Sequence, residues 1–354
     1  MKTSSLRWPA RPVAVRVPAT SANLGPGFDA LGLALGLHDV VEARIIARGL
    51  SIEVSGAGQD AAAAGEAHLV IRAMRTAFAE LGCQPPGIGL RCVNAIPQGY
   101  GLGSSAAAIV AGLLAARALA ADSGETGVQP VSPAWARPGA APGPAGSPSA
   151  GHACADPGAG RGPGVPTAAG RALLRLATRL EGHPDNAAAC LAGGLTIAWM
   201  SASGAESASL VPVAGLAPVL CVPENPLPTA QARQVLPAVV PHADAAANSA
   251  RAALLIAALT GDPGLLLAGT EDFLHQPYRA AAMPATTDLI RRLRAAGIAA
   301  VVSGAGPAVL ALTMAGNDPG PQTVQPIADA AGAAWQVLAL DVDRQGAAVE
   351  TRPG

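Results

Sequence analysis

The chain has 354 residues and is half apolar, so it is long enough to bury one or two hydrophobic cores. Its formal net charge of -1 excludes the broad basic surface of a nucleic-acid-binding protein and a polybasic membrane patch. The longest wholly apolar run, residues 106–116, is too short to span a bilayer. We therefore expect a cytoplasmic protein that binds neither nucleic acid nor membrane.

The first part of the sequence alternates strand-like and helix-like segments. Period-two alternation of apolar residues predicts strands, and a helix-period stripe that ends at a glycine predicts an amphipathic helix. The expected strands are residues 13–20, 41–47, 50–56 and 87–97, and the expected helix is residues 68–82. An alanine-rich helix is expected at residues 104–121, directly after a glycine cluster.

The composition changes abruptly at residues 123–167. Pro, Gly, Ala and Ser dominate this stretch, so it cannot bury enough surface to offset the entropy of ordering. We expect a disordered insert within a loop, with an interdomain linker as the alternative. His152, Cys154 and Asp156 lie inside it and lack a scaffold that would make them a metal site.

Helical periodicity resumes at residues 170–180 and leads through a turn, a short helix and a glycine pair into a strand. From about residue 213 the pattern restarts as a strand, several helices and a strand-turn-strand unit. The expected helices are residues 244–259, 264–275 and 286–296, and the strand-turn-strand unit is residues 299–312. These elements predict an α+β fold, which we divide into domains at residues 1–212 and 213–354.

The cysteines and lysines of the sequence limit the kinds of site that the protein can contain. Five widely spaced cysteines form no CxxC pair, which argues against a disulfide framework and a zinc site. Lys2 is the only lysine, so no interior lysine can act as a phosphate-binding cation, a Schiff base or a general base. If the chain handles phosphate, then backbone amides, arginines and a metal ion must hold it.

A glycine-rich turn, IPQGYGLGSSAAA, precedes the alanine-rich helix. Glycines let the backbone approach an anion, and the N–H groups and dipole of the first helical turn can then hold phosphate. The candidate phosphate contacts in this segment are Pro97, Gly99, Gly101, Leu102, Gly103, Ser104, Ser105 and Ala106. The pattern also fits a simple turn with a serine cap, and it is neither a Walker A motif nor a Rossmann fingerprint.

Two carboxylates, an imidazole and an amide are concentrated in residues 181–186, EGHPDN. Pro184 interrupts regular helix, and Asp185 or Asn186 can cap the helix that follows. Capping explains one of these residues and leaves the others unexplained. A carboxylate that holds Mg²⁺ or accepts a proton from a hydroxyl is what phosphoryl transfer requires.

Four segments resemble, in order and spacing, the motifs of the GHMP kinases: VRVPATSANLGPGFDALGLAL, IPQGYGLGSSAAA, LEGHPDNAAACLAGGL and VVSGAGPAVLAL. Within that superfamily the opening segment, EGHPDN, PTAQAR (residues 228–233) and HQPYR (residues 275–279) resemble the homoserine kinases. The resemblance covers the chain except residues 123–167 and the two ends. It implies an N-terminal domain of the ribosomal-protein-S5 domain 2 type and a C-terminal ferredoxin-like domain, with the active site between them.

The resemblance also implies an activity, the ATP-dependent phosphorylation of the L-homoserine hydroxyl in threonine biosynthesis, with Mg²⁺ as cofactor. The glycine-rich loop would wrap the ATP phosphates, and Ser105 and Glu181 would bind Mg²⁺. Asp185, with His183 nearby, would hold the reacting hydroxyl. A homodimer is compatible with this assignment.

Homoserine offers a carboxylate and an ammonium group besides the reacting hydroxyl. Arginine forks match a carboxylate in geometry and charge, and Arg233 and Arg279 fall where the family's substrate-carboxylate arginines lie. Asn23 and Asp29, in the opening motif, are assigned to the ammonium group.

Some alternatives stay open. The glycine motif at residues 303–307 is either a tight hairpin turn or a segment that packs beside the phosphate loop. The chain could instead be a GHMP kinase for mevalonate or a sugar, or a catalytically silent relative that binds a small ligand. An NAD-dependent enzyme is disfavoured because no GxGxxG follows the first strand.

Overall fold

The computed structural model describes Trp8 and residues 11–121, 166–317 and 319–351. The insert predicted at residues 123–167 lies outside these ranges, except for its last two positions. Thr167 belongs to the next helix as its N-cap, because its side chain accepts a hydrogen bond from the Gly170 amide at 3.1 Å. The predicted insert was therefore too long at its C-terminal end.

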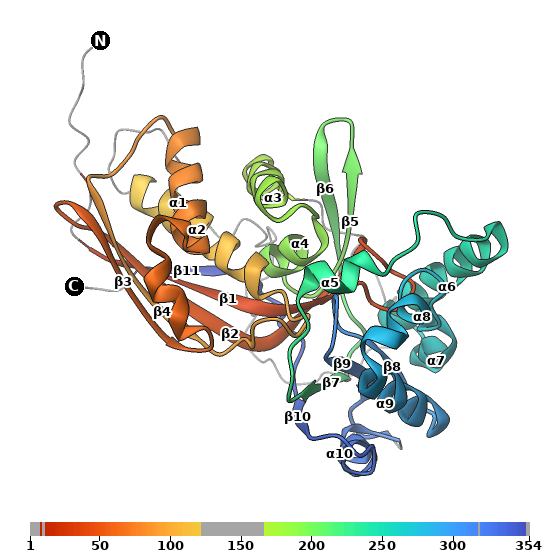
Figure 1. Cartoon of the computed structure of the whole chain (residues 1–354). Helices are drawn as coiled ribbons and strands as arrows, with labels where there is room; N and C mark the ends of the chain where they lie inside the picture. The colour runs from red at the N-terminus through yellow and green to blue at the C-terminus, as the bar shows by residue number, and fades with distance from the viewer. Residues whose placement is uncertain (1–7, 9–10, 122–165, 318, 352–354) are drawn as a thin grey trace, which may run out of the picture.

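Two β-sheets organise the fold (Figure 1). The first sheet has seven strands in the order β11-β1-β2-β4-β3, with β5 paired to β2 and β6 paired to β5. Its strands are β1 (Val13–Ala22), β2 (Leu31–Ile45), β3 (Gly49–Gly56), β4 (Gly87–Asn94), β5 (Leu195–Ser201), β6 (Gly204–Leu210) and β11 (Ala348–Thr351). The pairs are antiparallel, apart from β3 with β4.

Nearly all residues of β1 are buried, on both faces of the strand, whereas burial alternates along the second half of β2. In β1 the side chains of Val13, Val15 and Val17 lie in the core. The strand predicted at residues 41–47 is the second half of β2, which begins at Leu31. The prediction missed the first half because both faces of that half are buried, so no alternation marks it.

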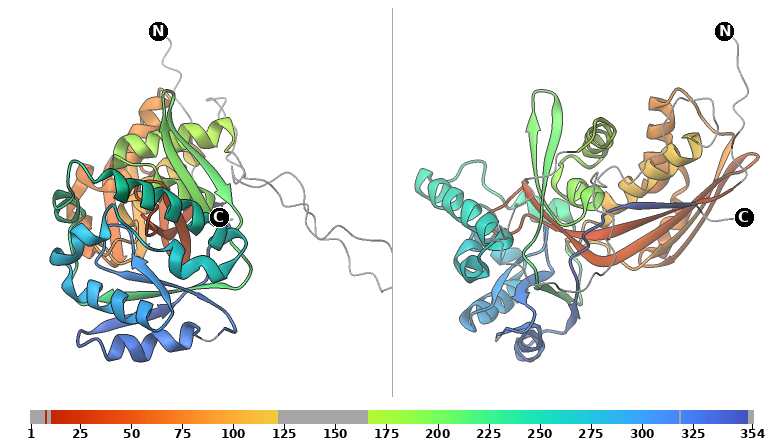
Figure 2. Two further views of the ribbon diagram at one scale, coloured as in Figure 1. Left: turned by 90° about the vertical axis from the view of Figure 1, so that its right-hand side faces the viewer. Right: turned by 180° about the vertical axis from the view of Figure 1, so that it is seen from behind.

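Helices cover one face of the first sheet, as the right-hand view in Figure 2 shows. They are α1 (Leu69–Glu80), α2 (Ser104–Ala121), α3 (Ala168–Glu181) and α4 (Asp185–Ala192), preceded by the 3₁₀ segment η1 (Gln59–Ala67). Gly112 lets α2 approach α1 closely, because a Cβ there would lie 2.5 Å from the Val70 carbonyl oxygen. By length and composition α2 could cross a membrane, but 67% of it is buried in the structure, as expected of a core helix.

The second sheet has the order β10-β7-β9-β8. Its strands are β7 (Leu216–Pro223), β8 (Ala299–Val302), β9 (Val309–Met314) and β10 (Trp335–Ala339), and α9 (Pro284–Ala295) and α10 (Pro321–Asp329) pack on it. The first and third strands of this set lie at the centre and the second and fourth at the edges, which is the ferredoxin-like order. The predicted α+β fold with a ferredoxin-like second part is confirmed.

Helices also fill the connection between β7 and β8. They are α5 (Thr229–Gln234), α6 (His242–Thr260), α7 (Leu266–Gly269) and α8 (Gln276–Arg279), with 3₁₀ segments at Pro263–Leu265 and Ala280–Ala282. The single helix predicted at residues 264–275 is wrong. α7 already ends at Gly269, and the Asp272 carboxylate accepts hydrogen bonds from the backbone amides of Leu274, His275 and Gln276, which holds the turn that leads into α8.

The end of the chain returns to the first sheet, where β11 pairs with β1. On the way Asp343 contacts His38 of β2 and accepts from the amides of Gln345 and Gly346. The last strand of segment 213–354 thus completes the sheet of the first segment. The domain boundary at residue 212 stays a prediction.

Candidate active site

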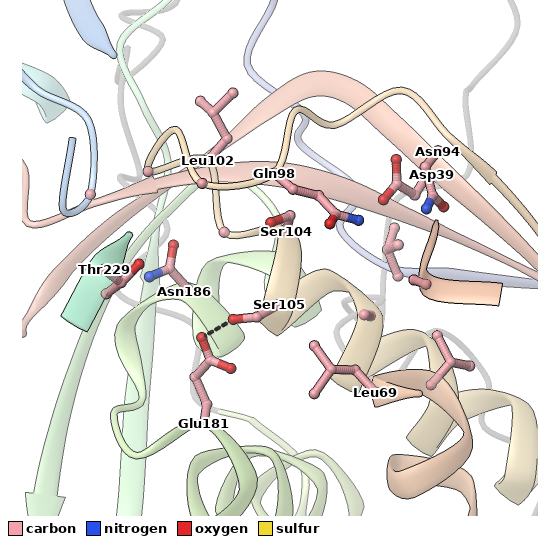
Figure 3. A pocket seen from close by; sticks show the side chains of 18 of the residues that line it. Asp39, Leu69, Asn94, Gln98, Leu102, Ser104, Ser105, Glu181, Asn186 and Thr229 are labelled. Carbon is pink, nitrogen blue, oxygen red and sulfur yellow. Dashed lines mark hydrogen bonds between the residues drawn. The ribbon is translucent and has the colours of Figure 1, made fainter. Parts of the chain in front are cut away.

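A cavity of about 410 Å³ lies where the loop before α2, the turn between α3 and α4, and the turn between β8 and β9 meet (Figure 3). The predicted site residues that line it are Asn23, Gly99, Gly101, Leu102, Gly103, Ser104, Ser105, Glu181, His183 and Arg233. The predicted site residues outside its lining are Pro97, Ala106, Asp29, Asp185 and Arg279. Pro97 lines a separate pocket together with Tyr100 and Trp335, and Ala106 is fully buried in the core.

The glycine-rich loop is fixed by backbone contacts on both sides. The Thr20 amide of β1 donates to the Leu102 carbonyl at 3.0 Å, and the Ser303 hydroxyl donates to the Gly101 carbonyl at 2.9 Å. The loop leads directly into α2, whose first N–H groups have no acceptor within the helix. A rigid loop and a helix N-terminus that line one cavity make an anion-binding wall.

Gly103 has a structural reason to be glycine. Its φ of +66° lies in the left-handed region, and a Cβ there would lie 2.0 Å from the Thr20 hydroxyl and 2.8 Å from the Asn186 amide oxygen. We expect Gly103→Ala to lower the free energy of unfolding by about 1–2 kcal/mol for the backbone conformation and by about 1–3 kcal/mol more for overlap.

Gly82→Ala is the matched control for this prediction. Gly82 also has a positive φ, +71°, but no atom lies within 4 Å of an added Cβ. Denaturant unfolding should therefore show only the backbone cost, about 1–2 kcal/mol, for Gly82→Ala. Equal losses for the two variants would mean that the contact with Thr20 carries no weight.

The glycine motif at residues 303–307 forms the turn between β8 and β9 and also packs on the loop. Besides the Ser303 contact, a Cβ on Gly304 would lie 2.6 Å from the Gly101 carbonyl oxygen, and Gly304 and Ala305 line the cavity. The motif is therefore a hairpin turn that also packs on the glycine-rich loop, so the two alternatives hold together, and its part in binding phosphate stays a prediction.

Ser105 and Glu181 meet in the cavity. The Ser105 hydroxyl, in the first turn of α2, donates to the Glu181 carboxylate at the end of α3, as the dashed line in Figure 3 marks. Gly182, with φ +98°, ends α3 directly after Glu181 and turns the chain toward Pro184. A hydroxyl and a carboxylate are hard oxygen ligands of the kind that Mg²⁺ prefers.

His183 lines the cavity, and Asp185 lies behind it. Asp185 is fully buried; its Oδ1 lies 2.9 Å from His183 Nδ1 and accepts a hydrogen bond from the Asn186 amide at 2.8 Å. This hydrogen bond raises the pKa of His183 above its ordinary value, against the opposing effect of burial. Asp185 Oδ2 is buried and has no hydrogen-bond partner among the described residues. The Asp185 carboxylate therefore does not line the cavity, but it contacts His183, which does.

Asn186 is a cavity residue that the sequence analysis treated only as a cap. Its side-chain oxygen accepts a hydrogen bond from the Thr20 hydroxyl at 2.8 Å, which leaves the amide nitrogen as the donor. Its place within EGHPDN, next to the residues that were assigned, was the signal that could have identified it.

Asn23 and Asp29 form one turn after β1. Both have positive φ, 53° and 50°, which is uncommon for residues other than glycine and often marks functional sites. The Asn23 side-chain oxygen accepts from the Asp29 amide at 2.8 Å. The Asp29 carboxylate pairs with both terminal nitrogens of Arg233, at 2.7 and 3.4 Å. The groups assigned to the ammonium and the carboxylate of a substrate are thus paired with each other.

Arg279 is fully buried beside this pair. Its Nε donates to the Ala232 carbonyl at 3.0 Å, its Nη1 contacts His275 Nδ1 at 2.9 Å, and its Nη2 has no hydrogen-bond partner among the described residues. Burial, assisted by the Arg233 charge, lowers the pKa of Arg279 to about 10. Both guanidinium carbons lie 5.6 Å from the centre of the Phe28 ring, so this missed residue lies next to both arginines.

The other end of the cavity is mostly apolar. Its walls come from η1, α1 and β4, namely Ala61, Ala64, Leu69, Val70 and Cys92, with the amides of Asn94 and Gln98 beside them. Asp39 borders this end and accepts from the backbone amides of Ala95 and Ile96, while burial raises its pKa. Apolar walls with a few amides suit a flat heteroaromatic ring. This end of the cavity could not be predicted from the sequence, because η1 has no periodic pattern.

Family models match both parts of the chain. The model described as GHMP kinases N terminal domain matches residues 68–128, and the one described as GHMP kinases C terminal matches residues 252–336. A Streptomyces coelicolor protein named homoserine kinase is 47% identical over 96% of this chain and 95% of its own length. A homoserine kinase from Clavibacter michiganensis is 44% identical over 96% of this chain and 94% of its own length.

Solved structures share the fold. The crystal structure of homoserine kinase from Cytophaga hutchinsonii superposes with a TM-score of 0.73 at 24% identity, covering 99% of this chain and 100% of that one. The phosphomevalonate kinase from Streptococcus pneumoniae gives 0.60 at 14% identity, covering 94% and 99%. Because kinases named for different acceptors share this fold, the fold alone does not identify the acceptor.

Proposed function

Because this chain belongs to the homoserine kinase family of the GHMP kinases, we propose that it transfers the γ-phosphate of ATP to the hydroxyl of L-homoserine. The product, O-phospho-L-homoserine, is an intermediate of threonine biosynthesis. The observation that carries the proposal is the layout of one cavity. An anion-binding loop and a Ser–Glu pair lie near groups suited to an amino acid, and His183 and Asn186 line the same cavity.

ATP is the phosphate donor expected of this family, and the proposed cradle for its phosphates is the loop from Gly99 to Ser105. No lysine lies among the described residues, so the loop amides and the N-terminus of α2 are proposed to supply the positive charge that faces the phosphates. The apolar end of the cavity, between η1 and β4, would take the adenine ring.

Mg²⁺ is proposed to bind at the Ser105 hydroxyl and the Glu181 carboxylate. The pair fits, because the two oxygens already touch at the edge of the phosphate cradle. Among the described residues no group of three acidic, His or Cys side chains could hold a metal, which agrees with an ion that takes its other ligands from phosphate and water. When bound, Mg²⁺ would offset negative charge on the phosphate oxygens.

Glu181→Gln tests this assignment. An amide oxygen is a weaker ligand than a carboxylate, so we expect the Mg²⁺ concentration for half-maximal turnover to rise about tenfold or more. A Mg²⁺ titration at fixed ATP measures it, and Glu80→Gln, which removes an exposed carboxylate outside the cavity, is the control. An unchanged Mg²⁺ requirement in Glu181→Gln would remove Glu181 from the metal site.

At the acceptor end we propose that homoserine separates the pair between Asp29 and Arg233. Its ammonium would take the Asp29 carboxylate together with Asn23, and its carboxylate would take Arg233 and the unpartnered Nη2 of Arg279. One ion pair, between Asp29 and Arg233, is then replaced by two, one at each end of homoserine. A zwitterion therefore gives a new partner to each of the two charges that it separates. A substrate with only one charge would leave Asp29 or Arg233 without a partner.

The reacting hydroxyl is proposed to lie between His183, Asn186 and the γ-phosphate. Asp185 is then a positioning residue: its contact with Nδ1 orients the His183 ring and leaves Nε2 as the second ring nitrogen. Thr20 orients Asn186 in the same way. A loose transition state needs alignment more than a strong base, which suits a site built from oriented hydrogen-bonding groups.

The direct experiment is to incubate the purified chain with ATP, Mg²⁺ and L-homoserine and to follow phosphorus by NMR. We expect ADP and a phosphate monoester in equal amounts. ADP with inorganic phosphate instead of a monoester would show hydrolysis without transfer and would contradict the proposal.

A further inference from the structure

A second cavity, of about 430 Å³, lies between α2 and α3, which are neighbours in the helical layer (Figure 1). Four arginines line it, Arg117 from α2 and Arg171, Arg175 and Arg179 from α3, and we call it the arginine cleft. The spacing of four residues puts the three arginines of α3 on one face of the helix. No residue lines both this cleft and the proposed active site.

Two of these four guanidinium groups have carboxylate partners. Arg175 pairs with Glu206 and Arg179 with Glu80. Neither Arg117 nor Arg171 has an ion pair within the part of the chain that the structure describes. Arg171 donates to the Pro166 carbonyl at 2.6 Å, and the buried Nε of Arg117 has no hydrogen-bond partner among the described residues. Among the described residues the four arginines thus have two carboxylates beside them, Glu80 and Glu206, which leaves an excess of two positive charges in the cleft.

Both unmatched charges are in unfavourable surroundings. Arg117 is half-buried, and this burial lowers its pKa because a desolvated guanidinium without an anion is costly. Arg171 lies near the start of α3, where the helix dipole disfavours a cation and the first turn has no acidic residue. An anion in the cleft would offset both costs.

We propose that the arginine cleft binds a doubly charged oxyanion, either inorganic phosphate or the phosphate group of a phosphate monoester. A dianion matches the two unpaired charges of Arg117 and Arg171, and guanidinium forks bind phosphate oxygens in pairs. The site goes beyond the proposed function, because it uses no residue of the active-site cavity.

The test is calorimetry with two anions, inorganic phosphate and glycerol 3-phosphate, in a low-salt chloride buffer. The cleft variant is Arg117→Gln with Arg171→Gln. The control is Arg91→Gln with Arg291→Gln, which removes the same charge from two exposed arginines outside the cleft. Wild type and control should bind alike at the cleft, and the cleft variant should bind there about tenfold more weakly or worse.

The two anions identify the source of the phosphate group. Equal affinity for both anions would show that the cleft recognises the phosphate group alone. Tighter binding of glycerol 3-phosphate would show that it recognises a phosphate monoester. Binding in the cleft variant that equals wild type overturns the proposal. Equal losses in the cleft variant and the control also overturn it, because a general charge effect then explains the affinity.

Thermal melting separates a binding defect from a folding defect. Without phosphate the cleft variant should melt at or above the wild-type temperature, because two uncompensated charges are gone. Phosphate should raise the melting temperature of wild type and control more than that of the cleft variant, in which only the active-site loop can still bind phosphate. Arg171→Gln alone leaves Arg117 in place and should also bind phosphate about tenfold more weakly. Equal stabilisation of all the variants by phosphate would exclude the cleft.

Discussion

Asp185→Asn should reduce turnover by about a hundredfold or more while ATP affinity stays within a few-fold of wild type. The amide keeps the shape of the side chain but removes the charge that faces His183 Nδ1, so the ring loses its fixed tautomer and orientation. ATP should bind normally because Asp185 does not line the cavity. Steady-state kinetics and nucleotide calorimetry measure the two effects separately.

A merely structural role for Asp185 would leave the His183 ring unchanged, and NMR titration of that ring tests this. The pKa of His183, raised in wild type by the contact with Asp185, should fall in the variant. Asp343→Asn is the matched control, since Asp343 contacts His38 in a similarly buried pair outside the cavity. It should cost stability and leave kcat intact. Turnover within threefold of wild type in Asp185→Asn would reduce Asp185 to a helix cap.

Arg233→Ala should lower kcat/KM for homoserine by about ten- to a hundredfold or more and hardly change the KM for ATP. The lost contact is a charge-assisted bond to the substrate carboxylate, worth about 1.5–3 kcal/mol, and Asp29 is left without its partner. Arg251→Ala is the control, because Arg251 is exposed to the same degree, 35% against 33%, and also pairs with a carboxylate, that of Glu271. It should leave kinetics unchanged.

The sharper form of this test uses homoserine amide, in which a neutral group replaces the carboxylate. Wild type should strongly prefer homoserine, and Arg233→Ala should lose that preference. If the variant kept it, the carboxylate would bind elsewhere. Arg279→Ala is a less clean probe than Arg233→Ala, because removing this buried side chain also leaves the Ala232 and Gly304 carbonyls without their donor.

Local patterns in the sequence predicted several of the helices and strands. The apolar stripe of α1 and the alternation of β1 identify both, and the alanine-rich α2 follows its glycine loop as expected. The pairing of β11 with β1 could not be predicted, because strand partners far apart in sequence leave no local mark. The break before α8 depends on hydrogen bonds of Asp272 that residue type alone does not specify.

The candidate site was predicted where glycines and charges cluster in sequence. The loop and the residues around Glu181 do line one cavity, because a short loop and a short turn leave their side chains little freedom. The burial of each polar side chain could not be predicted from the sequence. Asp185 and Arg279 are fully buried, whereas Asn186 lines the cavity, although all three are polar residues in recognisable motifs. Which polar group points inward depends on packing between distant segments.

The most direct test of the account compares acceptors with ATP and Mg²⁺ under identical conditions. The rate of ADP formation gives kcat/KM for L-homoserine, mevalonate, galactose and shikimate. Because the proposed acceptor site pairs a carboxylate and an ammonium at once, L-homoserine should exceed each of the others by about a hundredfold or more. An equal or higher kcat/KM for any other acceptor, or no ADP formation with homoserine, would contradict the account.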